Sequence, residues 1–67
     1  MLFQSRLVEA LKTTSKKQNI IAEECKIHPS CITQYKKGDT QPTLDVLFKL
    51  CKSLEVSADY LLGLSDY

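Results

Sequence analysis

The sequence predicts an all-α protein, a compact bundle of five helices. Apolar residues recur at helical spacings in successive segments, and no segment shows the two-residue alternation of a strand. The chain contains only two glycines and two prolines, which suits helices better than a turn-rich β fold. Sixty-seven residues suffice for one small domain, so we expect a single domain over residues 1–67 with one shared core.

The first two helices are expected on either side of a polar break. The first covers about 2–13, where apolar residues stand three and four positions apart. Thr and Ser residues then interrupt the pattern. Ser15, with Gln18 three residues later, fits a capping box, so the second helix should begin near Ser15 and end at about Cys25.

The third helix has a clear start and a clear end. Pro29 suits the first helical position, because its missing N–H costs nothing there and its φ is already set. The helix should run over about 29–36 and bury Ile32 and Tyr35. Gly38 is expected to terminate it in a left-handed conformation.

Two further helices follow a loop. Thr43 should cap the fourth helix, which ends at about 54, and Ser57 should cap a short fifth helix over 58–62 that ends at Gly63. The fourth helix is expected to bury one apolar stripe, formed by Leu44, Leu47, Phe48, Cys51 and Leu54. The leucines after 60 and Tyr67 suit either the core or a dimer contact.

Several classes of protein are disfavoured by composition. No apolar run is long enough for a membrane span and no signal peptide is visible, so a cytoplasmic protein is expected. Cys25, Cys31 and Cys51 form no C-x-x-C pair and are read as small hydrophobic residues rather than as metal ligands. With one histidine and no phosphate-binding glycine loop, we expect no enzyme, no cofactor and no small-molecule ligand.

The charge is unevenly distributed along the chain. The formal net charge is only +1, but residues 1–37 carry seven Lys or Arg against three Glu, whereas residues 38–67 carry two Lys against five Asp or Glu. One basic end could therefore face a polyanion.

The second and third helices together have the spacing of a helix-turn-helix, over about 17–37. The run QNIIAEECKIHPSCITQYKKGDTQPTLDVLFKLCKSLEVSADYLLGL resembles the Cro/CI-type (XRE) helix-turn-helix domain of phage and bacterial repressors, and the resemblance covers nearly the whole chain. The residues that carry it are Arg6, Leu7, Gln18, Ala22, Ile27, Ser30, Ile32, Tyr35, Gly38, Pro42 and the run 56–62. It implies the lambda-repressor-like five-helix fold.

Three departures from the family pattern stand out. Lys26 occupies a turn position that the family usually fills with Gly, where a positive φ would cost on the order of 1 kcal/mol. His28 replaces the usual Ser or Thr cap, so we expect weaker capping with partial help from Ser30. Lys16 and Lys17 replace Leu-Thr and leave the start of the second helix uncertain by a turn.

The resemblance also implies which residues contact DNA. Those expected to face base edges in the major groove are Pro29, Ser30, Thr33 and Gln34. Those expected at the phosphates are Lys17, Gln18, Asn19, Lys36, Lys37, Thr40 and Gln41. Arg6 is expected to serve packing or an internal ion pair instead.

The resemblance implies a sequence-specific, double-stranded DNA-binding transcriptional regulator of the repressor type. A homodimer on an inverted-repeat operator is expected, because one recognition helix reads only a few base pairs. The alternative is a protein-interaction module on the same fold, antitoxin-like or antirepressor, which the low net charge and Pro29 favour. Without the resemblance, Thr33 and Gln34 would read as a solvated helix face.

Overall fold

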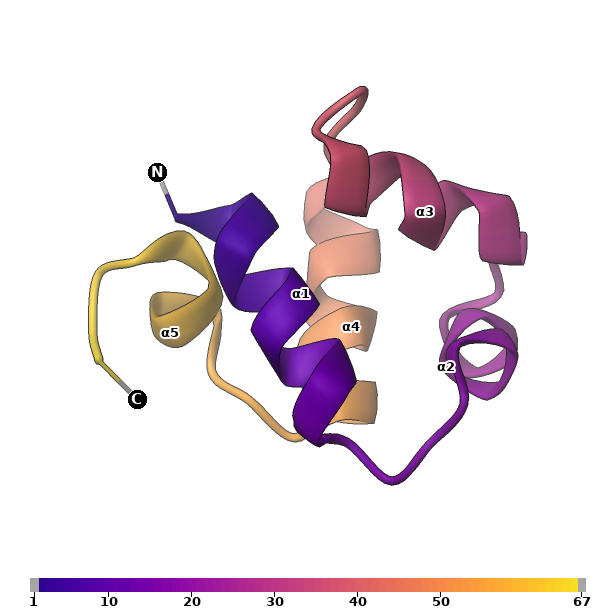
Figure 1. The fold of residues 1–67 in the computed structure, drawn as a ribbon, viewed down its shortest axis with the longest axis horizontal. Coiled ribbons are helices and arrows are strands. Elements are labelled where there is room, and N and C mark those ends of the chain that lie inside the picture. The colour runs from indigo at the N-terminus through magenta and orange to yellow at the C-terminus, as the bar shows by residue number, and fades with distance from the viewer. Residues whose placement is uncertain (1, 67) are drawn as a thin grey trace.

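The computed structural model describes residues 2–66 (Figure 1). Within that range the regular secondary structure consists of helices, without strands. The all-α, five-helix prediction is therefore confirmed for the described chain. In order, the helices are α1 Phe3–Thr13, α2 Gln18–Cys25, α3 Pro29–Lys37, α4 Leu44–Leu54 and α5 Ala58–Leu62.

The five helices pack around one core. α1 contacts α3 and α5, while α4 contacts α2 and α5. In Figure 1, α1 crosses in front of α4, with α5 on one side and α2 on the other. Each helix contributes one large, fully buried aliphatic side chain to the centre, and these are Leu7, Ile21, Ile32, Leu50 and Leu61.

Two of the predicted helix caps are confirmed, and one is wrong. Thr43 accepts a hydrogen bond from the Val46 N–H at 3.2 Å, and Ser57 caps α5 in the same way. The capping box at Ser15 is absent, because α2 begins only at Gln18 and Lys17 is its N-cap without a side-chain hydrogen bond. Of the other boundaries, α1 starts at residue 3 and α3 extends one residue further, to 37.

The predicted apolar stripe of α4 is wrong at two positions. Leu44 is 84% exposed and Phe48 is 61% exposed, whereas Leu50, which the prediction omitted, is fully buried. A stripe with Phe48 and a stripe with Leu50 both satisfy helical spacing. In the structure, the face of α4 that carries Leu47, Leu50 and Leu54 packs against the core. Leu44 and Phe48 consequently lie on an outer face.

The C-terminal leucines divide between core and surface. Leu61 is fully buried, Leu62 is half-buried and Leu64 is exposed. Tyr67, for which the prediction left the same two roles open, lies outside the described residues.

Lys26 adopts the left-handed conformation expected of a glycine position. Its φ is 59°, and its N–H donates to the carbonyl oxygen of Glu23 at 3.1 Å while the Ile27 N–H reaches Ala22 at 3.0 Å. The expected departure from the family pattern is thus confirmed. The turn between α2 and α3 therefore carries a strain on the order of 1 kcal/mol, because a non-glycine residue adopts this conformation.

Arg6 is used inside the protein, as predicted. Its Nη1 donates to the carbonyl oxygens of Tyr60 at 3.0 Å and Ser65 at 2.8 Å. Its guanidinium also lies 4.4 Å from the centre of the Tyr60 ring, and a carboxylate oxygen of Asp66 is 3.9 Å away. The arginine therefore holds the C-terminal segment against α1.

Lys16 takes part in a polar cluster that joins the α1–α2 loop, α2 and α4. Its Nζ donates to Glu24 at 2.9 Å and to the carbonyl oxygen of Ser53 at 2.8 Å. The Ser53 hydroxyl donates to the same Glu24 oxygen at 2.5 Å. These bonds to Ser53 and Lys16 lower the pKa of Glu24 below its ordinary value of 4.5.

This cluster makes stability depend on pH in acid. Because the folded state lowers the pKa of Glu24, its carboxylate stabilises the fold fully above pH 4.5, and this contribution is lost as the pH falls through the lowered value. We expect Glu24→Gln to reduce the free energy of unfolding at neutral pH and to flatten its decline below about pH 4.5. Urea unfolding across a pH series measures both effects. Glu23→Gln, which removes an adjacent exposed carboxylate outside the cluster, is the control, and identical curves for the two variants would contradict the prediction.

Candidate nucleic-acid interface

The interface is built on the close crossing of α2 and α3. Ala22 is fully buried and its small side chain lets the two helices approach, while Ile32 and Tyr35 point from α3 into the core. The opposite face of α3 is turned to solvent. There Pro29 and Gln34 are exposed, and the other two base-reading candidates lie beside them.

The base-reading candidates do not all stand free of the protein. Pro29, Ser30 and Gln34 are exposed on the outer face of α3, as a reading role requires. Thr33 is half-buried, and its hydroxyl oxygen accepts a hydrogen bond from Nε2 of Gln18 at 3.0 Å. Thr33 is therefore held in place by α2.

Histidine supplies the N-cap of α3 with its own side chain, and Ser30 is its hydrogen-bond partner. The Ser30 N–H donates to Nδ1 of His28 at 3.1 Å, which satisfies one of the unpaired amides of the first turn. The Ser30 hydroxyl lies 2.8 Å from the same nitrogen. The imidazole nitrogen thus takes the place of the usual hydroxyl oxygen, and Ser30 is its partner.

Gln18 links the two helices of the interface. Besides its bond to Thr33, Nε2 lies 3.4 Å from the carbonyl oxygen of Pro29. Its Oε1 accepts a hydrogen bond from Nζ of Lys36 at 3.0 Å. Two of the phosphate candidates, Gln18 and Lys36, are thereby joined side chain to side chain, with the lysine charge held at the N-terminal end of α2.

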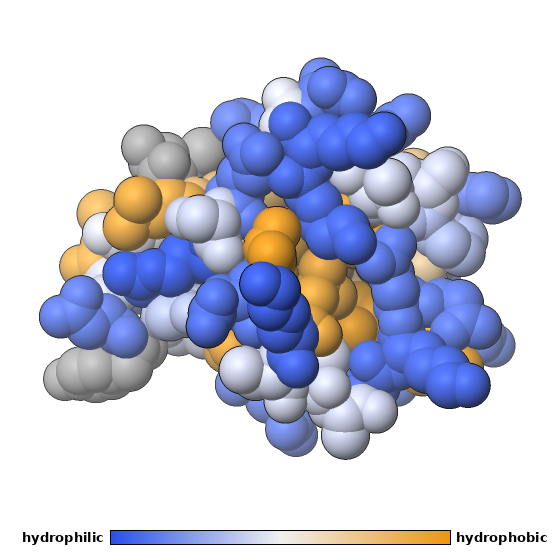
Figure 2. Space-filling model, viewed as in Figure 1, coloured by the Kyte–Doolittle hydropathy of each residue, from blue (hydrophilic) through white to orange (hydrophobic). Residues whose placement is uncertain are grey.

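The remaining phosphate candidates lie at the two edges of α3. Lys17 and Asn19 are exposed at the start of α2, where backbone N–H groups and the helix dipole favour an anion. At the other edge, Lys37, Thr40 and Gln41 are exposed at the end of α3 and in the loop that follows. Figure 2 shows mostly hydrophilic side chains over α3 and this loop.

Gly38 is required where α3 ends. Its φ is +81°, its N–H donates to Tyr35, and the Asp39 N–H donates to the carbonyl oxygen of Gln34 at 3.1 Å, which closes the helix as predicted. A Cβ at this position would lie 2.7 Å from Oε1 of Gln4. Gln4, exposed on α1 beside the loop, was not among the predicted site residues, because nothing in the helix-turn-helix spacing points to α1.

Three titratable groups in and beside the core stay neutral. Burial raises the pKa of the Cys25 and Cys51 thiols and of the Tyr35 hydroxyl, so all three keep their protons near neutral pH. No group of three His, Cys, Asp or Glu side chains within residues 2–66 could hold a metal ion. None of the helices described in that range is long and apolar enough to cross a membrane.

The cap on α3 gives a stability prediction. We expect His28→Ala to lower the free energy of unfolding by about 0.5–2 kcal/mol, because the Ser30 amide loses its acceptor. His28→Ser, which restores an oxygen acceptor at the N-cap, should recover most of the loss. Urea denaturation of the three proteins provides the measurement. If His28→Ala unfolds with the same free energy as the unsubstituted chain, the histidine cap contributes no stability and the prediction is contradicted.

Comparison with known proteins also identifies a helix-turn-helix. Residues 7–61 match the sequence model of the family described as helix-turn-helix. The cryptic phage CTXphi transcriptional repressor RstR of Vibrio cholerae serotype O1 is 33% identical over 63 residues, which cover 94% of this chain. The chain spans 56% of that relative, about half of its length.

Two solved structures share the fold. The crystal structure of the P22 c2 repressor protein in complex with a synthetic operator superposes with a TM-score of 0.82 at 26% identity, covering 91% of this chain and 92% of that one. The nuclear magnetic resonance structure of the DNA-binding domain of the P22 c2 repressor gives a TM-score of 0.84 at 28% identity, covering 100% and 91%.

Proposed function

Because this chain belongs to the helix-turn-helix family, we propose that it binds double-stranded DNA in a sequence-specific manner and represses transcription. The observation that carries the proposal is the outer face of α3. A helix anchored by Ile32 and Tyr35 and capped by His28 turns Pro29, Ser30 and Gln34 to solvent. An exposed helix of this kind, nine residues long, fits the major groove.

The side chains of α3 differ in what they can read. Gln34 can pair with N6 and N7 of adenine through two hydrogen bonds, whereas Ser30 can bond to several bases. Pro29 has no donor at its nitrogen and offers apolar contact, for instance to a thymine methyl group. Thr33 adds a hydroxyl that Gln18 holds in position.

Phosphate contacts would bracket the recognition helix. Lys17 and Asn19 lie at the start of α2, and Lys36 is held there by Gln18. Lys37 with the loop residues Thr40 and Gln41 lies at the other end of α3. Contacts on both sides would fix the orientation of α3 without reading the sequence.

A homodimer on an inverted repeat is part of the proposal. One α3 reads only a few base pairs, and two half-sites one turn apart are separated by about 34 Å. A repressor of this kind acts on DNA in the cytoplasm of a prokaryote. The low net charge of +1 still favours the alternative, a protein-interaction module, and the following experiment separates the two.

Selection from a random duplex pool tests the function. We expect enrichment of a short inverted repeat. Three lysines in each of two copies would make about six phosphate contacts, so affinity should fall about 10³-fold between about 50 and about 200 mM salt. Fluorescence anisotropy titration of the enriched duplex measures this slope. Absence of enrichment together with weak, salt-insensitive binding would exclude sequence-specific DNA binding and favour the protein-interaction module.

Gln34 and Lys37 provide a matched pair of variants on α3. Gln34→Ala should reduce discrimination at one base position of each half-site by about 1–3 kcal/mol, because alanine cannot hydrogen-bond to the base. Lys37→Ala should weaken binding to all sequences alike and reduce the salt slope by about 1 for each phosphate that is no longer neutralised. Titration against every single-base variant of one half-site separates the two effects. An unchanged preference at every position of the half-site would contradict the assignment of Gln34.

A further inference from the structure

The imidazole of His28 contacts Ser30 in two ways at the start of α3. The Ser30 N–H donates to Nδ1 of the ring at 3.1 Å, and the Ser30 hydroxyl oxygen lies 2.8 Å from the same nitrogen. Both residues are exposed, and Ser30 is one of the proposed base-reading residues. The ring is therefore bonded directly to a side chain that would face the DNA.

The backbone hydrogen bond fixes which ring nitrogen carries the proton. A neutral imidazole has one N–H nitrogen and one acceptor nitrogen. Because Nδ1 accepts from the Ser30 amide, the proton of the neutral ring must be on Nε2. The hydrogen between Nδ1 and the Ser30 hydroxyl oxygen then belongs to the hydroxyl group. Ser30 thus donates to His28 and turns only the lone pairs of its oxygen to solvent.

With His28 neutral, Ser30 can only accept a hydrogen bond from a base. The major groove offers donors at the amino groups of adenine (N6) and cytosine (N4), whereas guanine presents acceptors at N7 and O6 and thymine presents one at O4. We therefore expect the neutral form to favour adenine or cytosine opposite Ser30.

A proton on Nδ1 reverses this arrangement. Both nitrogens of an imidazolium ring are donors, so Nδ1 would donate to the Ser30 hydroxyl oxygen. The hydroxyl proton would then be free to turn outward and to meet an acceptor such as O6 of guanine or O4 of thymine. The Ser30 amide would lose its acceptor at the same time, an effect that is the same for every DNA sequence.

His28 is the only histidine of the chain, and imidazole is the side chain that ordinarily changes charge between about pH 5 and about pH 8. Its ring forms neither an ion pair nor a hydrogen bond with the charged side chains and the half-buried thiol of the helix-turn-helix unit, which are Lys17, Glu23, Glu24, Lys26, Cys31, Lys36 and Lys37.

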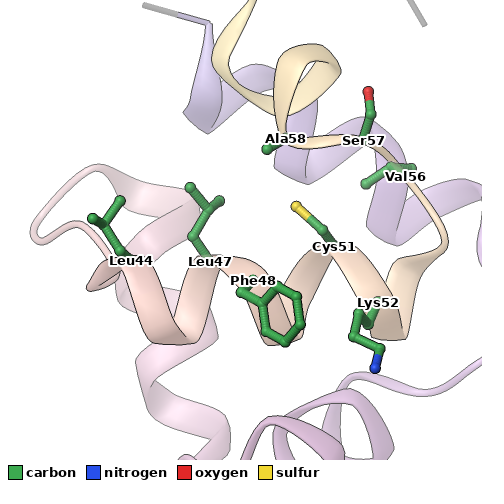
Figure 3. A pocket seen from close by; sticks show the side chains of 8 residues that line it. All are labelled: Leu44, Leu47, Phe48, Cys51, Lys52, Val56, Ser57 and Ala58. Atoms are coloured by element: carbon green, nitrogen blue, oxygen red, sulfur yellow. The ribbon is translucent and has the colours of Figure 1, made fainter.

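Other titratable groups keep one protonation state in this range. The lowered pKa of Glu24 leaves its carboxylate ionised. Figure 3 shows the Cys51 side chain directed from α4 into an apolar pocket that Val56 also lines. Burial raises the pKa of the Cys51 and Cys25 thiols, so both stay protonated.

We propose that protonation of His28 changes the base preference of Ser30 from adenine or cytosine to guanine or thymine, so that the sequence specificity of the protein depends on pH. This inference rests on the proposed function, in which Ser30 reads a base. His28 is a positioning residue, because it sets the direction of the Ser30 hydroxyl proton. A Ser or Thr N-cap, which the family usually has at this position, gains no proton in this range.

Base preference at two pH values tests the proposal. Ser30→Ala first identifies the half-site position at which discrimination is lost. Duplexes with each of the four bases at that position are then titrated by fluorescence anisotropy at about pH 8 and about pH 5.5. For the wild-type chain, we expect the affinity ratio of adenine or cytosine to guanine or thymine to fall about 3–10-fold at the lower pH, the size of one hydrogen bond.

His28→Asn is the matched control. Its amide oxygen caps a helix well and gains no proton, so this variant should keep the preference for adenine or cytosine at both pH values. Circular dichroism at each pH verifies that the proteins are folded. Long-range proton–nitrogen correlation spectra of the free wild-type chain test the tautomer without DNA, and the hydrogen should be found on Nε2 at about pH 8.

Four outcomes would overturn the proposal while specific DNA binding stands. They are a hydrogen on Nδ1 of the neutral ring, a wild-type preference that does not change with pH, an equal change in His28→Asn, and full discrimination by Ser30→Ala at every position. Absence of specific DNA binding by the wild-type chain at both pH values would overturn the proposed function itself, and this inference with it.

Discussion

The molecule depends on the meeting of five fully buried aliphatic side chains, one from each helix. None of the helices exceeds 11 residues and α5 has only five, lengths at which an isolated helix is marginal in water. Their stability therefore comes from burying one face against the others. Removing one such side chain would cost about 2–5 kcal/mol, a large part of the stability of a small protein. Ile32 is the member of this group that anchors α3, the helix of the proposed DNA contacts.

Polar contacts between distant segments add to the packing of the short helices. Arg6 ties the C-terminal segment to α1, and Lys16 ties the α1–α2 loop to α4. Both are long side chains whose charged ends reach backbone carbonyl oxygens across the fold. Each of them therefore joins segments that lie far apart in the sequence. Two of the chain's basic groups are thereby used for structure rather than for a partner.

Much of the fold was predictable because its signals are local. Pro29, Gly38 and the caps Thr43 and Ser57 act within one turn of the chain, and each stands where the sequence placed it. The errors arose where the outcome depended on distant packing. Whether α4 buries Leu50 or Phe48 depends on how α4 meets α2 and α5, and spacing along α4 alone cannot decide it. The start of α2 was misplaced because Ser15 offers a good local cap that the loop geometry does not use.

The candidate site also divides into features that local signals indicate and features that depend on packing between helices. The outward face of α3 could be located from the helical period, since Ile32 and Tyr35 set which face points inward. The base-reading role of that face was implied only by the family resemblance. The Gln18 contacts with Thr33 and Lys36 could not be foreseen, because they depend on the angle at which α2 crosses α3. His28 was expected at the cap position, but the hydrogen bond that its ring accepts from the Ser30 amide was not predicted.

The Gln18 amide has a consequence for chemical selectivity. A lysine ammonium can only donate, so the amide must turn its oxygen toward Lys36 and its NH₂ toward Thr33. The Thr33 hydroxyl then receives a hydrogen bond on one lone pair and keeps its proton for an outside group. In the proposed base-reading role, that proton would suit an acceptor such as the N7 or O6 of a guanine or the O4 of a thymine. A bond between two helices thus orients the hydroxyl group at one position of the proposed recognition surface.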